Sequence, residues 1–255
     1  MNKSLFVLAA MATVSVVGAQ SLFNNADGRG LMGPEGLATE TRAAGGFYSR
    51  ITDPGILYGF GTALDFIMAD DFTVGAGGWN VTSVTNFLYM TGSTGTAGAT
   101  GSVNGTTVEI HANNGGAVGS LLFSGTFQSA VYTNIYRTAP AANDDTRQVQ
   151  KVVSTFANVH LDPGTYWLTI EATGTGASGP WAPPLTAAGQ LKPSGSTNSQ
   201  QFDPSVPGWV PGIDNGSGEA QDVPFWIDGQ PVPEPATMMA LGLGAAALLR
   251  RRKKA

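Results

Sequence analysis

The stretch TTVEIHANNGGAVGSLLFSGTF, from Thr106 to Phe127, decides the fold. Its first residues alternate, so that Val108 and Ile110 point to one face of an extended strand while Glu109 and His111 point to the other. The letters NNGG supply residues that tolerate positive φ, and VGSLLFSGTF then returns as a second strand. The stretch therefore predicts a β-hairpin.

The rest of the chain body has the same character. Short runs rich in β-branched and aromatic residues alternate with clusters of Gly, Asn, Asp, Ser and Pro. VTSVTNFLYM (81–90) is apolar on both faces, which indicates a central strand, and DVPFWIDG (222–229) is predicted to be the closing strand. No repeat of fixed period occurs. We therefore expect an all-β fold, a single β-sandwich of jelly-roll type over residues 47–230, after a loosely structured leader at 20–46.

The N-terminus has the pattern of a secretory signal peptide, which we place at residues 1–19. Lys3 gives a small positive region, and Leu5 to Val17 forms an apolar segment of 13 residues. The small residues that follow predict cleavage by signal peptidase after Ala19. The chain is thus expected to start with a signal helix and to be exported.

The C-terminus, residues 231–255, combines an apolar run with a basic end. Ala236 to Leu249 contains 14 residues, which span about 21 Å as a helix against a hydrocarbon core of about 30 Å. This predicts a short transmembrane helix, completed by basic side chains that reach the interface and stay on the cytoplasmic side. These basic residues are Arg250, Arg251, Arg252, Lys253 and Lys254.

This C-terminus resembles the PEP-CTERM sorting signal of Gram-negative bacteria. Three ordered elements carry the resemblance: the motif Val232-Pro233-Glu234-Pro235, the apolar segment and the basic end. The resemblance implies recognition by an exosortase, a transient stay in the inner membrane, and cleavage near Pro233 to Pro235. The body would then reach the cell surface or an extracellular matrix. Some ice-binding proteins carry a similar C-terminal segment.

The composition of the body excludes several functions. Seven of the 13 Lys and Arg residues and all 18 acidic residues lie from Gln20 to Glu234, so this body has a net charge of −11. Such a body would repel the phosphates of nucleic acids, so no nucleic-acid partner is expected. Because the chain has no Cys, it can form neither a disulfide nor a cysteine–zinc site.

The residues that could carry chemistry form no recognised catalytic motif. His111 and His160 are the only histidines, and neither lies in a triad pattern. The acid pairs Asp70-Asp71 and Asp144-Asp145 are interpreted as solvated turns, with a calcium loop as the alternative. We expect no catalytic residue, no metal and no cofactor.

Trp181 in SGPWAPP and Trp209 in VPGWVPG are the candidate binding residues. Each lies in a Pro- and Gly-rich frame that stiffens a loop, and an exposed indole can stack on a sugar ring. The alternative is that each indole covers an open end of the sandwich. The Thr-rich segment TGSTGTAGAT (91–100) is broken by Gly and is interpreted as a flexible loop rather than as an ice-binding array.

These observations favour a non-enzymatic exported protein of the cell surface or extracellular matrix, sorted by an exosortase. The alternative is a carbohydrate-binding module that uses Trp181 and Trp209, with exopolysaccharide as its partner. Ice binding and an uncharacterised hydrolase with an acid pair stay open as further alternatives. Signal peptidase and exosortase are the partners expected during export.

Overall fold

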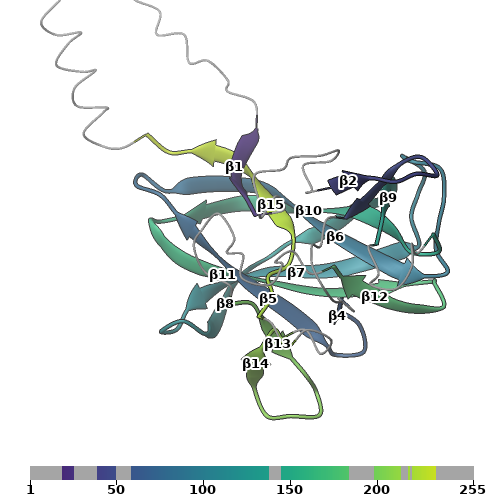
Figure 1. Cartoon of the computed structure of the whole chain (residues 1–255). Coiled ribbons are helices and arrows are strands. Elements are labelled where there is room, and N and C mark those ends of the chain that lie inside the picture. Colours follow the sequence, from purple (N-terminus) through teal and green to yellow (C-terminus); the bar gives the residue numbers. More distant parts are fainter. Residues whose placement is uncertain are drawn as a thin grey trace, which may run out of the picture.

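The computed structural model describes residues 19–25, 39–49, 59–137, 145–183, 198–213, 218 and 220–233. The regular secondary structure of these residues is all β, as the sequence predicts (Figure 1). The strands are β1 (Gln20–Asn24), β2 (Thr39–Thr41), β3 (Phe47–Ser49), β4 (Phe60–Gly61), β5 (Ile67–Val74), β6 (Trp79–Thr91), β7 (Val103–Asn113), β8 (Val118–Ser124), β9 (Thr126–Tyr136), β10 (Gln148–Leu161), β11 (Gly164–Gly174), β12 (Ser178–Ala182), β13 (Gln200–Phe202), β14 (Trp209–Pro211) and β15 (Phe225–Pro231).

The strands form two sheets. The larger sheet has nine strands, in the order β1-β15-β6-β10-β9-β3-β2, and β12 joins it beside β6 with β4 as its own neighbour. The smaller sheet has six strands, in the order β14-β13-β5-β11-β7-β8. The pairings are antiparallel except for the short contact between β3 and β9. From β5 onward, strands that follow one another along the chain often lie in different sheets. The chain therefore passes repeatedly from one sheet to the other.

One hydrophobic core joins the two sheets. Val84 and Leu88 of β6 in the larger sheet belong to the same buried cluster as Val108 and Ile110 of β7 in the smaller sheet. The alternation of both strands places these residues on the inner faces. Full burial of such side chains contributes about 1.5–3 kcal/mol each.

The prediction that residues 81–90 form a central strand is confirmed. β6 pairs with β10 on one side, and on the other side with β15 along most of its length and with β12 at its end. Its outer face is also apolar, because Phe87 belongs to a second buried cluster with Ile135 and Val149. The ring of Trp226 on β15 packs edge-on against Phe87, with a centroid distance of 5.3 Å.

The predicted hairpin at Thr106 to Phe127 forms, but it is shorter than expected. β7 and β8 pair as predicted, and β8 ends at Ser124. Gly125 marks the corner, and its N–H donates to the carbonyl of Val108 at 2.8 Å. A Cβ at Gly125 would lie 2.8 Å from the ring of Phe156, so only glycine fits where the chain leaves for β9 of the larger sheet.

Two strands lie within residues 20–46, where the sequence indicated a loose leader. β1 is an edge strand that pairs with β15, and β2 pairs with β3. Phe23 packs on Phe225 with a centroid distance of 5.2 Å. Asn25 is fully buried, donates to Asp70 Oδ2 at 3.0 Å and accepts from the N–H of Phe225 at 2.9 Å. These contacts come from partners far along the chain, which no local pattern reveals.

The Gly- and Thr-rich segment after β6 is fixed to the sheet, although the sequence indicated a flexible loop. The N–H of Gly95 donates to Gln148 Oε1 at 2.7 Å, and the N–H of Gly98 donates to the carbonyl of Tyr132 at 2.8 Å. Ser93 Oγ lies 2.8 Å from the hydroxyl of Tyr132. Because Gln148 is buried on β10, its amide can serve the backbone of this segment rather than water.

The closing strand predicted at 222–229 is confirmed as β15. Phe225 and Ile227 are fully buried, and the strand lies between β1 and β6. The pairing continues through Pro231, opposite Trp79, and the N–H of Val232 donates to the carbonyl of Gly78 at 2.9 Å. The sheet thus reaches the first residues of the sorting segment.

The predicted signal helix and the predicted C-terminal transmembrane helix lie outside the described residues. Within the described residues, no helix has the length and apolarity needed to cross a membrane.

Candidate functional site

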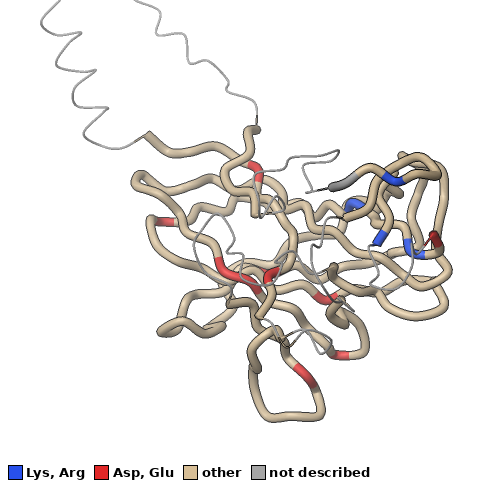
Figure 2. Tube along the Cα trace, in the orientation of Figure 1, with Lys and Arg blue, Asp and Glu red and all other residues tan. Residues whose placement is uncertain are grey.

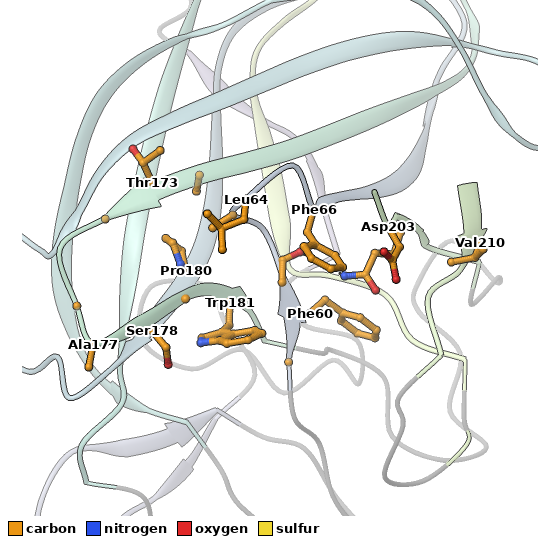
Figure 3. A pocket seen from close by; sticks show the side chains of 18 of the residues that line it. Phe60, Leu64, Phe66, Thr173, Ala177, Ser178, Pro180, Trp181, Asp203 and Val210 are labelled. Atoms are coloured by element: carbon orange, nitrogen blue, oxygen red, sulfur yellow. Dashed lines mark hydrogen bonds between the residues drawn. The ribbon is translucent and has the colours of Figure 1, made fainter. Parts of the chain in front are cut away.

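A cleft of about 960 Å³ opens where β4 and β12 of the larger sheet approach the β13–β14 hairpin of the smaller sheet (Figure 3). The end of β11 and the turn after β4 complete its wall. Its lining combines three aromatic rings, aliphatic side chains and a few polar groups. These side chains include Phe60, Leu64, Phe66, Trp181, Gln201 and Asp203.

The aromatic part of the cleft comes from β4, the turn after it, and β12. Phe60 is buried, whereas Phe66 and Trp181 are only partly buried and so offer ring surface to a ligand. Gly61 lies between these two rings, since a Cβ there would be 3.5 Å from Phe66 and 3.7 Å from Trp181. The absence of a side chain at Gly61 therefore keeps the space between the rings open.

The SGPW sequence fixes the position of Trp181. Gly179 has a φ of 97°, and a Cβ there would lie 2.5 Å from Cδ1 of Trp181. Only glycine therefore fits before Pro180. Trp181 pairs with Gly61 of β4 and with Tyr89 of β6, and the hydroxyl of Thr62 donates to the carbonyl of Pro180 at 2.9 Å. Backbone pairing on two sides therefore fixes the backbone of Trp181, from which the indole extends.

A strained turn forms the rim of the cleft. The N–H of Phe66 donates to the carbonyl of Ala63 at 3.2 Å, and the two central residues, Leu64 and Asp65, have φ values of 59° and 67°. This left-handed conformation is unfavourable for residues other than glycine, and least so for Asn and Asp. Leu64 is 87% exposed. The turn therefore presents a large apolar side chain to solvent at the cleft, at a cost in backbone energy.

The polar part of the cleft comes from β13 and the residues after it. Gln201 lines the cleft and donates from Nε2 to the carbonyl of Gly61 at 3.3 Å. Asp203 accepts at Oδ1 from the N–H of Ser205 at 2.8 Å and from its hydroxyl at 2.6 Å. The hydroxyl and then the backbone of Ser205 hold the pKa of Asp203 below its usual value. Within the described residues, Oδ2 of Asp203 accepts no hydrogen bond.

The two tryptophans predicted as binding residues have different positions. Trp181 lines the cleft. Trp209 lies on β14 beside it, and its ring packs edge-on against Phe202 with a centroid distance of 5.8 Å. The adjacent Val210 and Pro211 line the cleft instead of Trp209.

Other lining residues were not identified from the sequence. Phe60 stands between two glycines, which is a weak signal, and Gln201 and Asp203 lie in a segment without clear strand periodicity. Gln201 meets the carbonyl of Gly61 across 140 residues of sequence. Only the pairing of β13 with β5 and of β12 with β4 brings these segments together.

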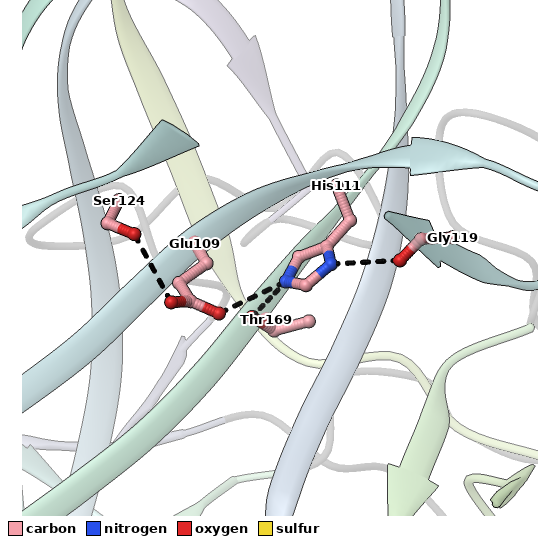
Figure 4. Close-up of polar contacts among 5 residues, drawn as sticks. All are labelled: Glu109, His111, Gly119, Ser124 and Thr169. Carbon is pink, nitrogen blue, oxygen red and sulfur yellow. Dashed lines mark hydrogen bonds and ion pairs between the residues drawn. The ribbon is translucent and has the colours of Figure 1, made fainter. Parts of the chain in front are cut away.

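A second polar cluster surrounds His111 on the outer face of the smaller sheet (Figure 4). His111 Nδ1 donates to the carbonyl of Gly119 at 3.1 Å, and Nε2 lies 3.2 Å from Glu109 Oε2 and 3.3 Å from the hydroxyl of Thr169. Ser124 donates to Glu109 Oε1 at 3.2 Å. We call these four side chains the histidine cluster. A catalytic triad needs the acid on one imidazole nitrogen and the hydroxyl on the other, whereas here both approach Nε2.

The remaining candidates have structural partners. His160 lies 2.9 Å from Asn80 Oδ1 through Nδ1 and 3.5 Å from Asp162 through Nε2. Asp70 is buried and accepts from Asn25 and from the N–H of Val223, so it is part of the core rather than a solvated turn. Among the described residues, no three His, Asp or Glu side chains are grouped so that they could hold a metal ion.

The second acid pair is described only in part. Asp144 lies outside the described residues. Asp145 accepts from Arg42 Nε at 2.9 Å, so this carboxylate forms an ion pair with a partly buried guanidinium.

Comparison with known families identifies the C-terminal segment. A family model described as the PEP-CTERM protein-sorting motif matches residues 231–253. Comparison of the whole chain with curated proteins gives no match. The matched motif indicates an exported protein that is processed by an exosortase and sorted at the membrane to the cell surface.

The sorting motif begins directly at the edge of the fold. Pro231 pairs with Trp79, Val232 is bonded to Gly78, and Pro233 is exposed. Ala19, the predicted signal-peptidase site, is exposed and immediately precedes β1. The other predicted sorting residues, Glu234, Pro235, Arg250, Arg251, Arg252, Lys253 and Lys254, lie outside the described residues.

Proposed function

We propose that this chain is a non-enzymatic surface protein whose body, a jelly-roll sandwich, binds a carbohydrate in the aromatic cleft. The observation that carries the proposal is the cleft itself, where the partly exposed rings of Phe66 and Trp181 lie beside the polar side chains of Gln201 and Asp203. A pyranose ring has apolar C–H faces and a hydroxyl edge. Aromatic surface with a few fixed polar groups is the combination that such a ligand needs.

The strand order supports a jelly roll. With β9 taken as an inserted strand and the short strands β2, β3, β4, β12, β13 and β14 left aside, the larger sheet contains β1-β15-β6-β10 and the smaller sheet contains β5-β11-β7-β8. If these eight strands are numbered along the chain, the two sheets have the orders 1-8-3-6 and 2-7-4-5, which is the jelly-roll arrangement. Jelly rolls are common among lectin domains.

The sorting segment and the cleft lie near opposite ends of β6. Trp79 at the start of β6 pairs with Pro231, whereas Tyr89 near its end pairs with Trp181. At a rise of about 3.3 Å per residue, these two pairings are roughly 33 Å apart. A body still held in the inner membrane through its sorting segment would therefore carry the cleft well away from its attachment point.

The proposal that the protein is not an enzyme rests on what the carboxylates and histidines do. Among the described residues that line the cleft, Asp203 is the only carboxylate, whereas glycoside hydrolysis usually needs two on either side of the bond. The imidazole of His111 is occupied at both nitrogens by its own neighbours. The hydrolase alternative therefore has less support than carbohydrate binding.

The proposed route combines the two end signals. Signal peptidase cuts after Ala19, the sorting segment anchors the chain briefly in the inner membrane, and exosortase cleaves near Pro233 to Pro235. The body is then released to the surface or extracellular matrix of a Gram-negative cell, where exopolysaccharide is the candidate partner. The PEP-CTERM match at 231–253 supports the exosortase step.

Binding is tested with the mature protein on an array of neutral, amino and acidic polysaccharides, with tryptophan fluorescence as a second readout. Replacement of Trp181 by Ala is expected to weaken binding at least tenfold, which corresponds to about 1.4 kcal/mol. Trp209→Ala is the matched control, because its ring packs on Phe202 outside the cleft, and it should bind like the wild type. Absence of binding to every polysaccharide, or equal binding by Trp181→Ala, would refute the carbohydrate proposal.

Delivery is tested separately by cell fractionation. Replacement of Pro233, Glu234 and Pro235 by Ala should retain the unprocessed protein in the inner membrane, while the wild type reaches the surface at reduced mass. If both forms reach the surface with the same processed mass, the motif has no sorting role in this chain.

A further inference from the structure

The charged side chains of the described residues are unevenly distributed (Figure 2). Four basic residues occur among the described residues, namely Arg42, Arg137, Arg147 and Lys151, and Figure 2 shows the basic positions gathered on the side of the larger sheet where β2, β9 and β10 lie. None of them lines the cleft, and Asp203 is the one charged residue among the described residues of its lining. The cleft wall is therefore negative and contains no described cation.

The arginines are also engaged where they lie. Arg42 donates to Asp145 and covers the ring of Tyr136, with 4.2 Å between its guanidinium carbon and the ring centroid. Arg137 is buried over the ring of Tyr89 at 5.4 Å, and Arg147 donates from Nε to the hydroxyl of Thr91 at 3.1 Å. Movement of a guanidinium into the cleft would break these contacts, so we expect these cations to stay in place when a ligand binds.

Two carboxylates contribute the negative field of the cleft. Asp203 stands in the wall with Oδ1 bonded to Ser205. Asp65 lies beside Leu64 in the rim turn and is exposed. A carboxylate accepts hydrogen bonds from sugar hydroxyls, and it attracts an ammonium group and repels a second anion. An anionic ligand would also meet the net charge of −11 of the body.

We propose, on the basis of the carbohydrate function above, that the cleft selects saccharides without anionic groups and rejects uronic-acid and sulfated polymers. The rings of Phe66 and Trp181 bind the sugar face, and Asp203 accepts from hydroxyl groups at its edge. A carboxylate on the sugar replaces a donor with an acceptor and adds a like charge. Neutral hexose polymers and amino sugars therefore fit, and acidic matrix polymers do not.

The test uses matched pairs of hexasaccharides that differ only at C6. Cellohexaose, mannohexaose and galactohexaose are compared with the hexamers of glucuronic, mannuronic and galacturonic acid by isothermal titration of the mature protein. At least one neutral hexamer should bind ten times more tightly than its acidic counterpart at low ionic strength. The ratio should shrink as salt is added, because exposed charges are screened.

Asp203→Asn removes the charge and keeps an oxygen that can accept from Ser205, and it should reduce the neutral-to-acidic ratio at least threefold. Asp162→Asn is the control, because it changes the net charge equally at a carboxylate that is 87% exposed and lies outside the cleft. The control should leave the ratio unchanged. Equal or tighter binding of an acidic hexamer overturns the selectivity proposal and leaves the carbohydrate proposal intact. Absence of binding to all six hexamers overturns the selectivity proposal, whereas the carbohydrate proposal falls only if no polysaccharide of the neutral, amino and acidic array binds.

Discussion

The aromatic cleft and the histidine cluster differ in what their side chains are already doing. The histidine cluster contains the more reactive residue types, yet Glu109, His111, Ser124 and Thr169 bond to one another or to the backbone of the sheet. The cleft contains less reactive residues, but Trp181 leaves ring surface and Asp203 leaves a carboxylate oxygen available. Reactive residue types alone therefore do not make a site, because a site also needs groups that the fold has not used.

The two regions also differ in backbone. The histidine cluster lies on the paired strands β7 and β11, whose register is regular around the cluster and shifts only at Thr173/Gly174, and the pairing of β7 with β8 has further shifts. The cleft is built on short strands and on a turn with two residues of positive φ other than glycine. Backbone that is held in an unfavourable conformation often marks a functional position, and here it displays Leu64.

The largest effect should come from the core that both regions share. Phe225 is fully buried and contacts Phe23 and Phe72 between the sheets. Phe225→Ala should lower the free energy of unfolding by about 3–5 kcal/mol, because it removes a large ring and leaves a cavity. Urea unfolding measures this change, with Phe225→Leu as a milder control. A loss below about 1 kcal/mol would contradict the single shared core.

The histidine cluster should affect stability without affecting ligand binding. His111→Ala removes the bonds to Gly119 and Glu109, and each such bond contributes about 0.5–1.5 kcal/mol. We expect a loss of about 1–2 kcal/mol in urea unfolding and a saccharide affinity within twofold of the wild type. His160→Ala, at a side chain that is 49% exposed, serves as a control and should change stability by less than about 0.5 kcal/mol. Loss of binding in His111→Ala would make the histidine cluster part of the site.

The rim turn offers a gain in stability. Asp65 has a φ of 67°, so Asp65→Gly should raise the free energy of unfolding by about 0.5–1 kcal/mol, whereas Asp65→Ala should lower it. Thermal unfolding of the two variants gives the comparison directly. If glycine and alanine have the same effect, the backbone at the rim is not strained.

The smallest expected effect on stability comes from two aspartates whose pKa values are shifted in opposite directions. Desolvation raises the pKa of Asp228 on β15, against hydrogen bonds from Trp226 and Ser83, while bonds from Ser205 lower the pKa of Asp203. An acid with a raised pKa opposes folding once it ionises, and this cost disappears as the pH falls below its unfolded value of 3.8. Asp203 instead stabilises the fold above that pH and loses its contribution as the pH falls through its lowered pKa.

Asp228→Asn should therefore give a small increase in stability at pH 7 and none well below pH 3.8. Asp203→Asn should have the opposite sign at pH 7. Chemical unfolding at the two pH values measures both variants. An increase for Asp228→Asn that is the same at both pH values would show that its charge is not the cause.

Local patterns were sufficient for the main strands and insufficient for the site. The alternation of Val108 and Ile110 and the two apolar faces of 81–90 identified β7 and β6, because each strand carries its own pattern. β1 could not be predicted from its own residues, because its burial depends on Phe225 of β15. The N–H of Phe225 donates to Asn25, directly after β1, across 200 residues of sequence. The fixed Gly-rich segment was missed for a similar reason, since Gln148 looks like a surface residue until its amide meets Gly95.

The cleft shows the same limit. Trp181 was recognised because its Pro and Gly neighbours are adjacent in sequence, and Gly179 does shape its surroundings. Phe66, Gln201 and Asp203 could not be associated with it, because only the pairing of edge strands brings them together. Trp209 has the same kind of frame as Trp181, yet its ring packs on Phe202, so the local frame does not determine which way an indole points.

The five tryptophans make the central claim directly measurable by NMR. Each indole N–H gives one signal in a nitrogen-15 correlation spectrum of the mature protein, and Trp→Phe variants assign them. During titration with the tightest-binding neutral hexasaccharide, the Trp181 signal should shift and saturate. The Trp167 signal, from an indole that donates to Asn113 at 3.1 Å beside the histidine cluster, should stay in place. A saturating shift of Trp167 with no change at Trp181 would contradict the assignment of binding to the aromatic cleft.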